Sequence, residues 1–230
     1  MQLPTFECPQ RLAGGLRLPA RMTLLLLGPR RLTLVSPIPI DDALAATLAA
    51  HGEVELLIAP NALHHLYLEA AMQRYPHASV LVPPALVAKR PGLRHDGTLD
   101  GALPASLRAS TDVVRIEGAP RIDEFALYHR DTRTLVVTDL VFHVLRPQGW
   151  LTHLVLLAVG CHGRLAQSRA YRGLIRDRAA AARSVEQLLA LPFETLIMAH
   201  GEIVRDDARA RLAEALRGLL PSRQALPLPR

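Results

Sequence analysis

Four apolar residues run directly into a histidine, a glycine and a glutamate in the segment Leu196-Ile197-Met198-Ala199-His200-Gly201-Glu202. A short and nearly continuous apolar run of this kind predicts a buried β-strand, which we place at Thr195–Ala199. Ligand and catalytic side chains are common at such strand ends, because the strand fixes the backbone while the following loop opens to solvent. His200 is therefore a candidate site residue.

Two other segments put polar, metal-competent side chains at the end of a short apolar strand. They are Leu57-Ile58-Ala59-Pro60-Asn61-Ala62-Leu63-His64-His65 and Leu135-Val136-Val137-Thr138-Asp139. Three imidazoles and a carboxylate are adequate ligands for zinc or ferrous iron. The candidate metal ligands are therefore His64, His65, Asp139 and His200.

The elements between these segments alternate between strand and helix. We expect strands at Met22–Leu27, Arg31–Val35, Val54–Ala59, Ser79–Val82, Val113–Glu117, Glu124–Arg130 and Thr134–Asp139. Cap and start signals predict helices that begin at Asp41, at Asn61 (running to about Tyr75), at Pro83-Pro84, at Asp177 and at Asp206 or Asp207. Residues 90–112 are typical of a loop, and residues 144–176 are ambiguous. Two sheets flanked by helices would account for this order, and a single doubly wound sheet is the competing arrangement.

Length and composition favour one large α/β domain. The chain has 230 residues, and half of them are hydrophobic. We expect a single domain over residues 1–230, with weakly structured ends at about 1–10 and 221–230. No apolar run reaches the roughly 18–20 residues that span a bilayer, and no signal peptide is visible. Two cysteines, Cys8 and Cys161, form no disulfide framework, which favours a reducing cytoplasm.

The positive charge does not indicate a nucleic-acid partner. The net charge is +6, but Lys89 is the only lysine and the arginines are scattered along the chain. Nucleic-acid footprints are clustered on one face, and single-strand binders interleave them with aromatic residues, which are only 4% of this chain. We expect neither a nucleic-acid nor a membrane partner, and expect a small-molecule substrate or ligand instead.

The three segments together resemble motifs of the metallo-β-lactamase-like superfamily. His200-Gly201 is similar to its terminal His-Gly strand end, and Thr138-Asp139 to its Gly-Asp element with threonine in the glycine's place. Residues 60–65 lie where the superfamily carries His-x-His-x-Asp-His. The resemblance covers most of residues 20–220 and is closest to a poorly characterised branch with a similar Pro-Asn…His-His signature. It implies a four-layer αββα sandwich.

The departures from these motifs are concentrated in one of the superfamily's two metal sites. Its three first-site histidines fall on Pro60, Ala62 and Ala119, which cannot bind metal, and His64 falls on an aspartate position. The second-site positions hold His64, His65, Asp139 and His200. The resemblance therefore implies a reduced site with one zinc or iron ion. Adjacent side chains in a helical turn point about 100° apart, so His64 and His65 are difficult to bring to one ion together.

Two functions remain open from the sequence. The first is a metal-dependent hydrolase in which one ion activates water for attack on an ester, thioester or amide. The second keeps the fold without the metal, as a non-catalytic small-molecule-binding or interaction protein, and Pro60, Ala62 and Ala119 favour it. A nucleic-acid-processing relative is a third possibility, against which the scattered arginines argue.

Overall fold

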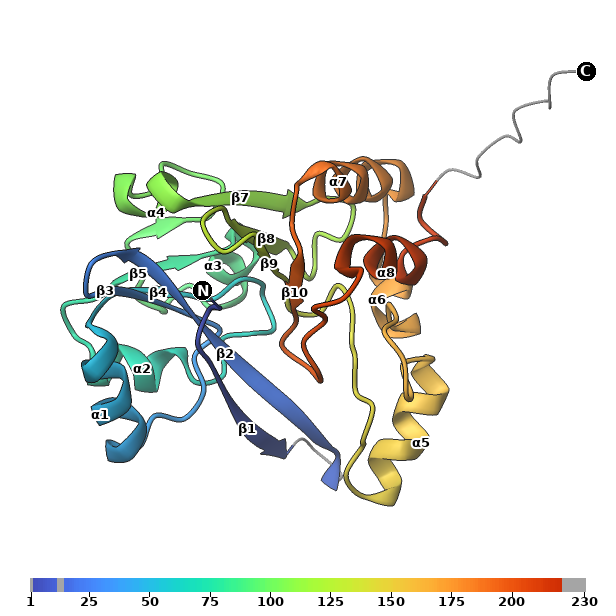
Figure 1. The fold of residues 1–230 in the computed structure, drawn as a ribbon, viewed down its shortest axis with the longest axis horizontal. Helices are drawn as coiled ribbons and strands as arrows, with labels where there is room; N and C mark the ends of the chain where they lie inside the picture. Colours follow the sequence, from blue (N-terminus) through green and yellow to red (C-terminus); the bar gives the residue numbers. More distant parts are fainter. Residues whose placement is uncertain (1, 12–14, 221–230) are drawn as a thin grey trace, which may run out of the picture.

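The computed structural model describes residues 2–11 and 15–220 and contains two β-sheets flanked by helices (Figure 1). The larger sheet has the order β1-β2-β3-β4-β5-β6, formed by Thr5–Arg11, Arg17–Gly28, Arg31–Val35, Glu53–Ile58, Ser79–Val82 and Gly97–Thr98. The smaller sheet has the order β10-β9-β8-β7, formed by Thr195–Ile197, Thr134–Val136, Glu124–His129 and Thr111–Ile116. The predicted tail at 221–230 lies outside the described residues.

The helices are α1 to α8, at Asp42–His51, Leu68–Arg74, Pro84–Lys89, Ala105–Ser110, Trp150–Val159, Arg169–Leu174, Arg178–Ala190 and Ala208–Ala215. Helices α1, α2 and α3 cover the outer face of the larger sheet, and α7 and α8 cover that of the smaller sheet. The cap predicted at Asp41 is confirmed, since its carboxylate accepts a hydrogen bond from Leu44 N at 2.8 Å. None of the helices within the described residues is long and apolar enough to cross a bilayer.

Successive residues of the larger sheet divide between two hydrophobic cores. Leu57 of β4 belongs to a buried cluster with Leu48 of α1 and Leu68 of α2. The next residue, Ile58, belongs instead to a cluster with Phe125 of β8 in the smaller sheet. This division follows from the two-residue repeat of a strand, which sends neighbouring side chains to opposite faces.

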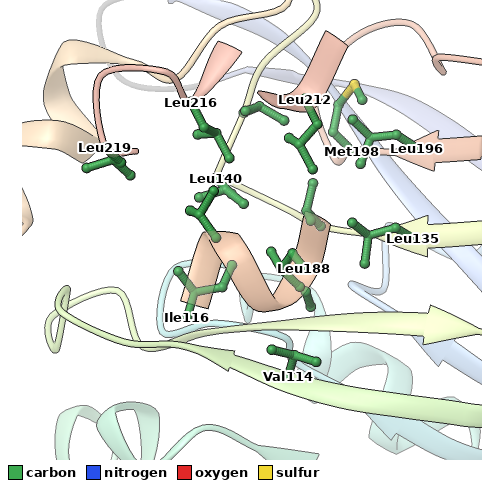
Figure 2. Close-up of a cluster of buried hydrophobic side chains, with 14 of the residues drawn as sticks. Val114, Ile116, Leu135, Leu140, Leu188, Leu196, Met198, Leu212, Leu216 and Leu219 are labelled. Atoms are coloured by element: carbon green, nitrogen blue, oxygen red, sulfur yellow. The ribbon is translucent and has the colours of Figure 1, made fainter. Parts of the chain in front are cut away.

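The smaller sheet divides in the same way. Ile197 of β10 faces the larger sheet, whereas Leu196 packs outward in the cluster that contains Leu188 of α7 and Leu212 of α8 (Figure 2). The layers are therefore helices, sheet, sheet and helices. The predicted four-layer αββα sandwich is confirmed, and the competing single doubly wound sheet is wrong.

The first strand departs from the sequence prediction of a weakly structured N-terminal end. β1 pairs antiparallel with β2 along its whole length, from Thr5 opposite Thr23 to Arg11 opposite Arg17. Its proline, Pro9, is tolerated because β1 is an edge strand and needs hydrogen bonds on one side only. The two prolines were therefore a poor guide, and residues 5–11 form a strand instead of a weakly structured end.

Three other segments also differ from their predictions. The helix predicted to start at Asn61 begins only at Leu68, because residues 61–67 form turns. The predicted loop at 90–112 contains the short strand β6 and helix α4. The ambiguous stretch 144–176 contains α5 and α6. The apolar residues of α5 continue around the helix, so its sequence shows no clear period.

Candidate metal centre

Three of the predicted ligands meet at the ends of strands from both sheets. His64 lies in the turns after β4, Asp139 follows β9 and His200 follows β10. β9 and β10 are parallel neighbours, so their carboxyl ends lie side by side. One ligand atom from each of the three residues lies within 4.8 Å of the other two. They are the one group of three or more such side chains found this close together in residues 2–11 and 15–220.

The Asp139 carboxylate lies between the two imidazole rings. Its Oδ2 is 3.3 Å from His64 Nε2, and its Oδ1 is 3.5 Å from His200 Nε2. Asp139 and His200 are buried. Burial raises the pKa of Asp139, but the adjacent His64 and His200 rings outweigh burial and hold that pKa well below its usual range. The carboxylate is therefore ionised and presents an oxygen to each ring.

The other nitrogen of each ring is held by a hydrogen bond. His200 Nδ1 donates to the carbonyl oxygen of Pro19 at 2.7 Å, and His64 Nδ1 lies 2.7 Å from the Ser36 hydroxyl. A carbonyl only accepts, so Nδ1 of His200 carries a proton, and Nε2 offers a lone pair to a metal ion whenever the ring is neutral. Hydrogen bonds of this kind orient ligating histidines in metal sites and fix their tautomer.

The donor set fits a metal ion of the zinc or ferrous iron type. A lone pair on His200 Nε2 facing a carboxylate oxygen at 3.5 Å is repulsive unless a proton or a metal ion lies between them. Nitrogen and oxygen ligands at about 2.0–2.1 Å from a tetrahedral ion lie about 3.3–3.4 Å from one another. The separation of 3.3 Å between His64 Nε2 and Asp139 Oδ2 agrees with that value, and His200 Nε2 lies 3.5 Å from the other oxygen, Oδ1. Two imidazoles and one carboxylate leave a position open for water or substrate.

Asn61 links the Asp139 carboxylate to the turn that carries His64. Its Nδ2 donates to Asp139 Oδ2 at 2.7 Å and to the Thr138 hydroxyl at 2.9 Å. Its Oδ1 accepts from the backbone N–H groups of Leu63 and His64, both at 2.8 Å. These bonds hold residues 61–64 in a turn, which explains why the helix predicted from Asn61 starts later.

Replacing Asn61 by alanine is expected to weaken binding of zinc by about 10- to 100-fold, the usual effect of losing a partner that orients a ligand. The substitution removes one hydrogen bond to Asp139 and both bonds to the turn that carries His64. Competition with a chromogenic chelator measures the affinity. Thr47→Ala, which removes an exposed hydroxyl within α1, is the control and should leave the affinity unchanged. An Asn61→Ala protein with wild-type affinity would contradict this role.

A second carboxylate lies beneath the first. Glu124 of β8 is completely buried, and it accepts hydrogen bonds from the N–H groups of Thr138, Asp139 and Leu140 at 2.7, 3.2 and 3.2 Å. Burial and the charge of Asp139 raise the pKa of Glu124 to about 7. Its three hydrogen bonds hold the backbone that carries Asp139 in place. The strand sequence around Glu124 gives no sign of this role.

The glycine after His200 is required by a close approach of two loops. Gly201 has a φ of +102°, and a Cβ at this position would overlap the carbonyl group of His143. His143 N in turn donates to the carbonyl oxygen of His200 at 3.0 Å. The His-Gly pair seen in the sequence therefore has a geometric cause, because the chain can turn closely past His143 only with glycine.

His65 is the predicted ligand that the structure does not bring to this cluster. It lies next to His64 in the turn, but its Nε2 is 3.3 Å from Lys89 Nζ. Burial, Lys89 and Arg90 lower the pKa of the His65 imidazole. Neighbouring side chains of a turn point in different directions, so only His64 reaches Asp139. We therefore leave His65 out of the proposed ligand set.

The three positions that lack the superfamily's first-site histidines are closely packed. Ala62 and Ala119 are buried in apolar clusters. Ala62 N donates to Ile122 O at 2.8 Å, and Ile122 N donates to Ala119 O at 3.0 Å. Pro60 O accepts from Phe125 N at 2.8 Å. Backbone hydrogen bonds and small apolar side chains thus occupy the region where those positions meet.

A pocket of about 220 Å³ opens onto the cluster. Apart from His64, Asp139 and His200, no charged side chain of the described residues lines it. Phe142 stacks on the His200 ring, with centroids 4.9 Å apart and planes 13° apart. The other lining residues are mostly apolar, namely Gln10, Leu18, Ala20, Ser36, Pro37, Ile38, Leu63, Leu66 and Tyr67. The sequence analysis did not predict this wall, because its members come from five separate segments.

Solved structures of metallo-β-lactamases resemble this chain over nearly its whole length. An enzyme from Pontibacter korlensis matches with a TM-score of 0.63 and 12% identity over 95% of this chain and 99% of its own. One from Erythrobacter litoralis has a TM-score of 0.59 and 14% identity over 93% and 88%. FIM-1 from Pseudomonas aeruginosa in its mono-zinc form has a TM-score of 0.57 and 12% identity over 94% and 92%.

No protein-family model and no curated protein sequence matches the chain. The likeness therefore lies in the three-dimensional arrangement of the elements, at a sequence identity too low to transfer an activity. Together with the two stacked sheets and their outer helices, it confirms the resemblance drawn from the sequence at the level of the fold: this chain has the metallo-β-lactamase fold.

Proposed function

We propose that the protein is a metal-dependent hydrolase with one ion, held by His64, Asp139 and His200. The observation that carries the proposal is the orientation of the two rings. Their Nδ1 atoms are engaged by Ser36 and Pro19, while their Nε2 atoms converge on the Asp139 carboxylate. Such an arrangement is typical of histidines that bind metal through Nε2.

A bound zinc or ferrous ion would polarise a carbonyl group and lower the pKa of a water ligand to about 7. The residues of this chain supply the remaining requirements. Asn61 and Glu124 hold the carboxylate and its backbone in place. The wall formed by Phe142 and its apolar neighbours excludes water from one side of the cluster. Packing at Pro60, Ala62 and Ala119 supports one ion rather than two.

The pocket favours a neutral, apolar acyl group as substrate. Its wall offers no lysine or arginine among the described residues, so it has no partner for a carboxylate or phosphate on the substrate. A volume of about 220 Å³ suits a short acyl chain. We therefore propose a small neutral ester or thioester, with a neutral amide as the less reactive third possibility.

Elemental analysis of the purified protein, followed by an ester assay, tests this function. We expect about one zinc or iron ion per chain and hydrolysis of p-nitrophenyl butyrate that stops when a chelator removes the ion. p-Nitrophenyl hydrogen succinate, which carries a carboxylate on an acyl chain of the same length, is the matched control. After its spontaneous hydrolysis is subtracted, the protein should hydrolyse it at least about tenfold more slowly, because the wall leaves that charge without a partner. Metal-independent hydrolysis, or an equal rate on both esters, would contradict the proposal.

A non-catalytic binding protein is the second candidate, and the same cluster supplies an observation for it. His64 and His200 lie close enough to Asp139 to neutralise its charge if a ring is protonated, so the site can be satisfied without an ion. A folded protein that contained no metal after growth with added zinc and iron would support this candidate. Ligand-binding screens with neutral apolar molecules would then replace the hydrolysis assay.

A further inference from the structure

Helix α5 is attached to the rest of the molecule along one face. Thr152 and Leu156 are its buried residues. The Thr152 hydroxyl lies 3.1 Å from both the N and the O of Arg17, at the start of β2. Gly160, in the left-handed conformation, ends the helix by donating to the carbonyls of Leu156 and Leu157. The helix is thus a well-defined element at the edge of the molecule, beside the outer end of the β1–β2 hairpin (Figure 1).

The opposite face of α5 carries a stripe of large apolar side chains. Trp150, Leu154 and Leu157 have exposed fractions of 73%, 54% and 57%, and Leu145 just before the helix is 44% exposed. Spacings of four and three residues place the helical members on one face. In the described part of the chain, the other large hydrophobic residues this exposed are Leu63 and Leu66, which border the pocket. The α5 stripe therefore has no role in the site described above.

The chain segment that carries this stripe has basic side chains and no acidic ones, although Glu202 reaches the start of the stripe, where its Oε2 accepts from Leu145 N at 2.9 Å. Residues 140–176 contain five arginines and no aspartate or glutamate. Arg146 precedes the helix, and two others lie at its carboxyl end, where Arg164 donates to Gly160 O and Arg169 to Ala158 O, both at 3.0 Å. All three are exposed. The stripe thus has guanidinium groups near both of its ends.

We propose that α5 and its flanking arginines dock onto the surface of an anionic lipid membrane. A short helix with tryptophan and leucine on one face and arginines around it lies in the headgroup region of a bilayer without crossing it. The sequence predicts no membrane partner because no apolar run is long enough to span, but surface docking requires no such run. The arginines would pair with lipid phosphates while Trp150, Leu154 and Leu157 enter the acyl boundary.

A protein partner fits the stripe less well. Stable protein interfaces bury about 800 Å² on each side, which is more than one helical stripe of three side chains provides. A second copy of this chain would bring Arg146, Arg164 and Arg169 of both molecules together, at a cost in charge repulsion. An anionic bilayer requires no groove and satisfies the arginines directly.

Trp150 is the only tryptophan of the chain, so its fluorescence reports on this helix alone. We would titrate the full-length protein with vesicles of phosphatidylcholine containing phosphatidylglycerol. The expected result is a blue shift of the emission together with co-sedimentation. Pure phosphatidylcholine vesicles should bind roughly 100-fold more weakly, because each of three arginines near an anionic surface contributes roughly fivefold. Half-molar NaCl should reverse much of the binding.

Two paired variants locate the docking surface. Leu154→Glu with Leu157→Glu is expected to abolish binding, whereas Leu63→Glu with Leu66→Glu, which changes equally exposed leucines elsewhere, should leave it intact. Equal binding to neutral and anionic vesicles, or equal loss in both variants, would overturn the proposal. A blue shift that grows with protein concentration in the absence of vesicles would identify a second copy as the occupant and overturn it too. If circular dichroism shows that the α5 variant is unfolded, the proposal is tested by the wild-type protein alone, through its binding to anionic and neutral vesicles at low and high salt.

Discussion

Purified His200→Ala protein is expected to contain almost no metal, against about one zinc or iron ion per chain in the wild type. The substitution removes one of three converging ligand atoms, and with it the ring that Pro19 O holds in place. Loss of a residue that merely orients a ligand costs about 10- to 100-fold in affinity, so loss of a ligand should cost more. Elemental analysis of both proteins, purified side by side without added metal, makes the measurement.

The matched control for this experiment is His65→Ala. His65 is the next residue to a proposed ligand, yet its ring contacts Lys89 instead of Asp139. Its removal should leave the metal content unchanged. If His200→Ala retained its ion, the ligand assignment would be wrong. If His65→Ala lost the ion as completely, the turn at 61–67 would have to present the other histidine to the site.

A Glu124→Ala substitution is expected to lower the free energy of unfolding by roughly 3–5 kcal/mol, because three buried N–H groups lose their acceptor. Glu124 is the shared acceptor of Thr138, Asp139 and Leu140. Glu124→Gln keeps one acceptor oxygen and should lose less stability. Urea unfolding followed by circular dichroism gives both values.

An exposed glutamate provides the comparison for Glu124. Glu194 pairs with Arg133 at the surface, and its side chain is 63% exposed. Glu194→Ala should therefore change the free energy of unfolding by less than about 1 kcal/mol, as is usual for surface ion pairs. A loss at Glu124 no greater than the loss at Glu194 would show that the backbone around Asp139 does not depend on the buried carboxylate.

The residues themselves were sufficient to predict most strands and three members of the cluster, for a physical reason, whereas the four-layer arrangement was predicted from the resemblance to a known superfamily. A buried strand leaves a continuous apolar run, and a polar residue at its end is conspicuous. Asp139 and His200 could be found in this way, and so could the turn that carries His64. The choice between His64 and His65 could not, because it depends on the direction of two adjacent side chains in a turn whose form is set by the bonds of Asn61.

Sequence patterns could not predict the contacts that support the cluster. Ser36 and Pro19 hold the two rings, one through a hydroxyl and the other through a backbone carbonyl, and neither group leaves a periodic signal. Glu124 reads as an ordinary strand residue, although its carboxylate is buried among backbone N–H groups. Residues 150–159 are apolar on most sides, so their exposed stripe emerges only once the buried face is known.

The hydrogen bond between Pro19 and His200 also has a consequence for how the newly synthesised chain folds. It joins residues 181 positions apart, so the cluster is completed only after His200 has left the ribosome. Contacts this distant in sequence form late in folding, after the cost of closing the intervening loop has been met. An ion bound here cannot nucleate the fold. The nascent chain must assemble both sheets unaided, and the proposed metal ion would then stabilise a structure that already exists.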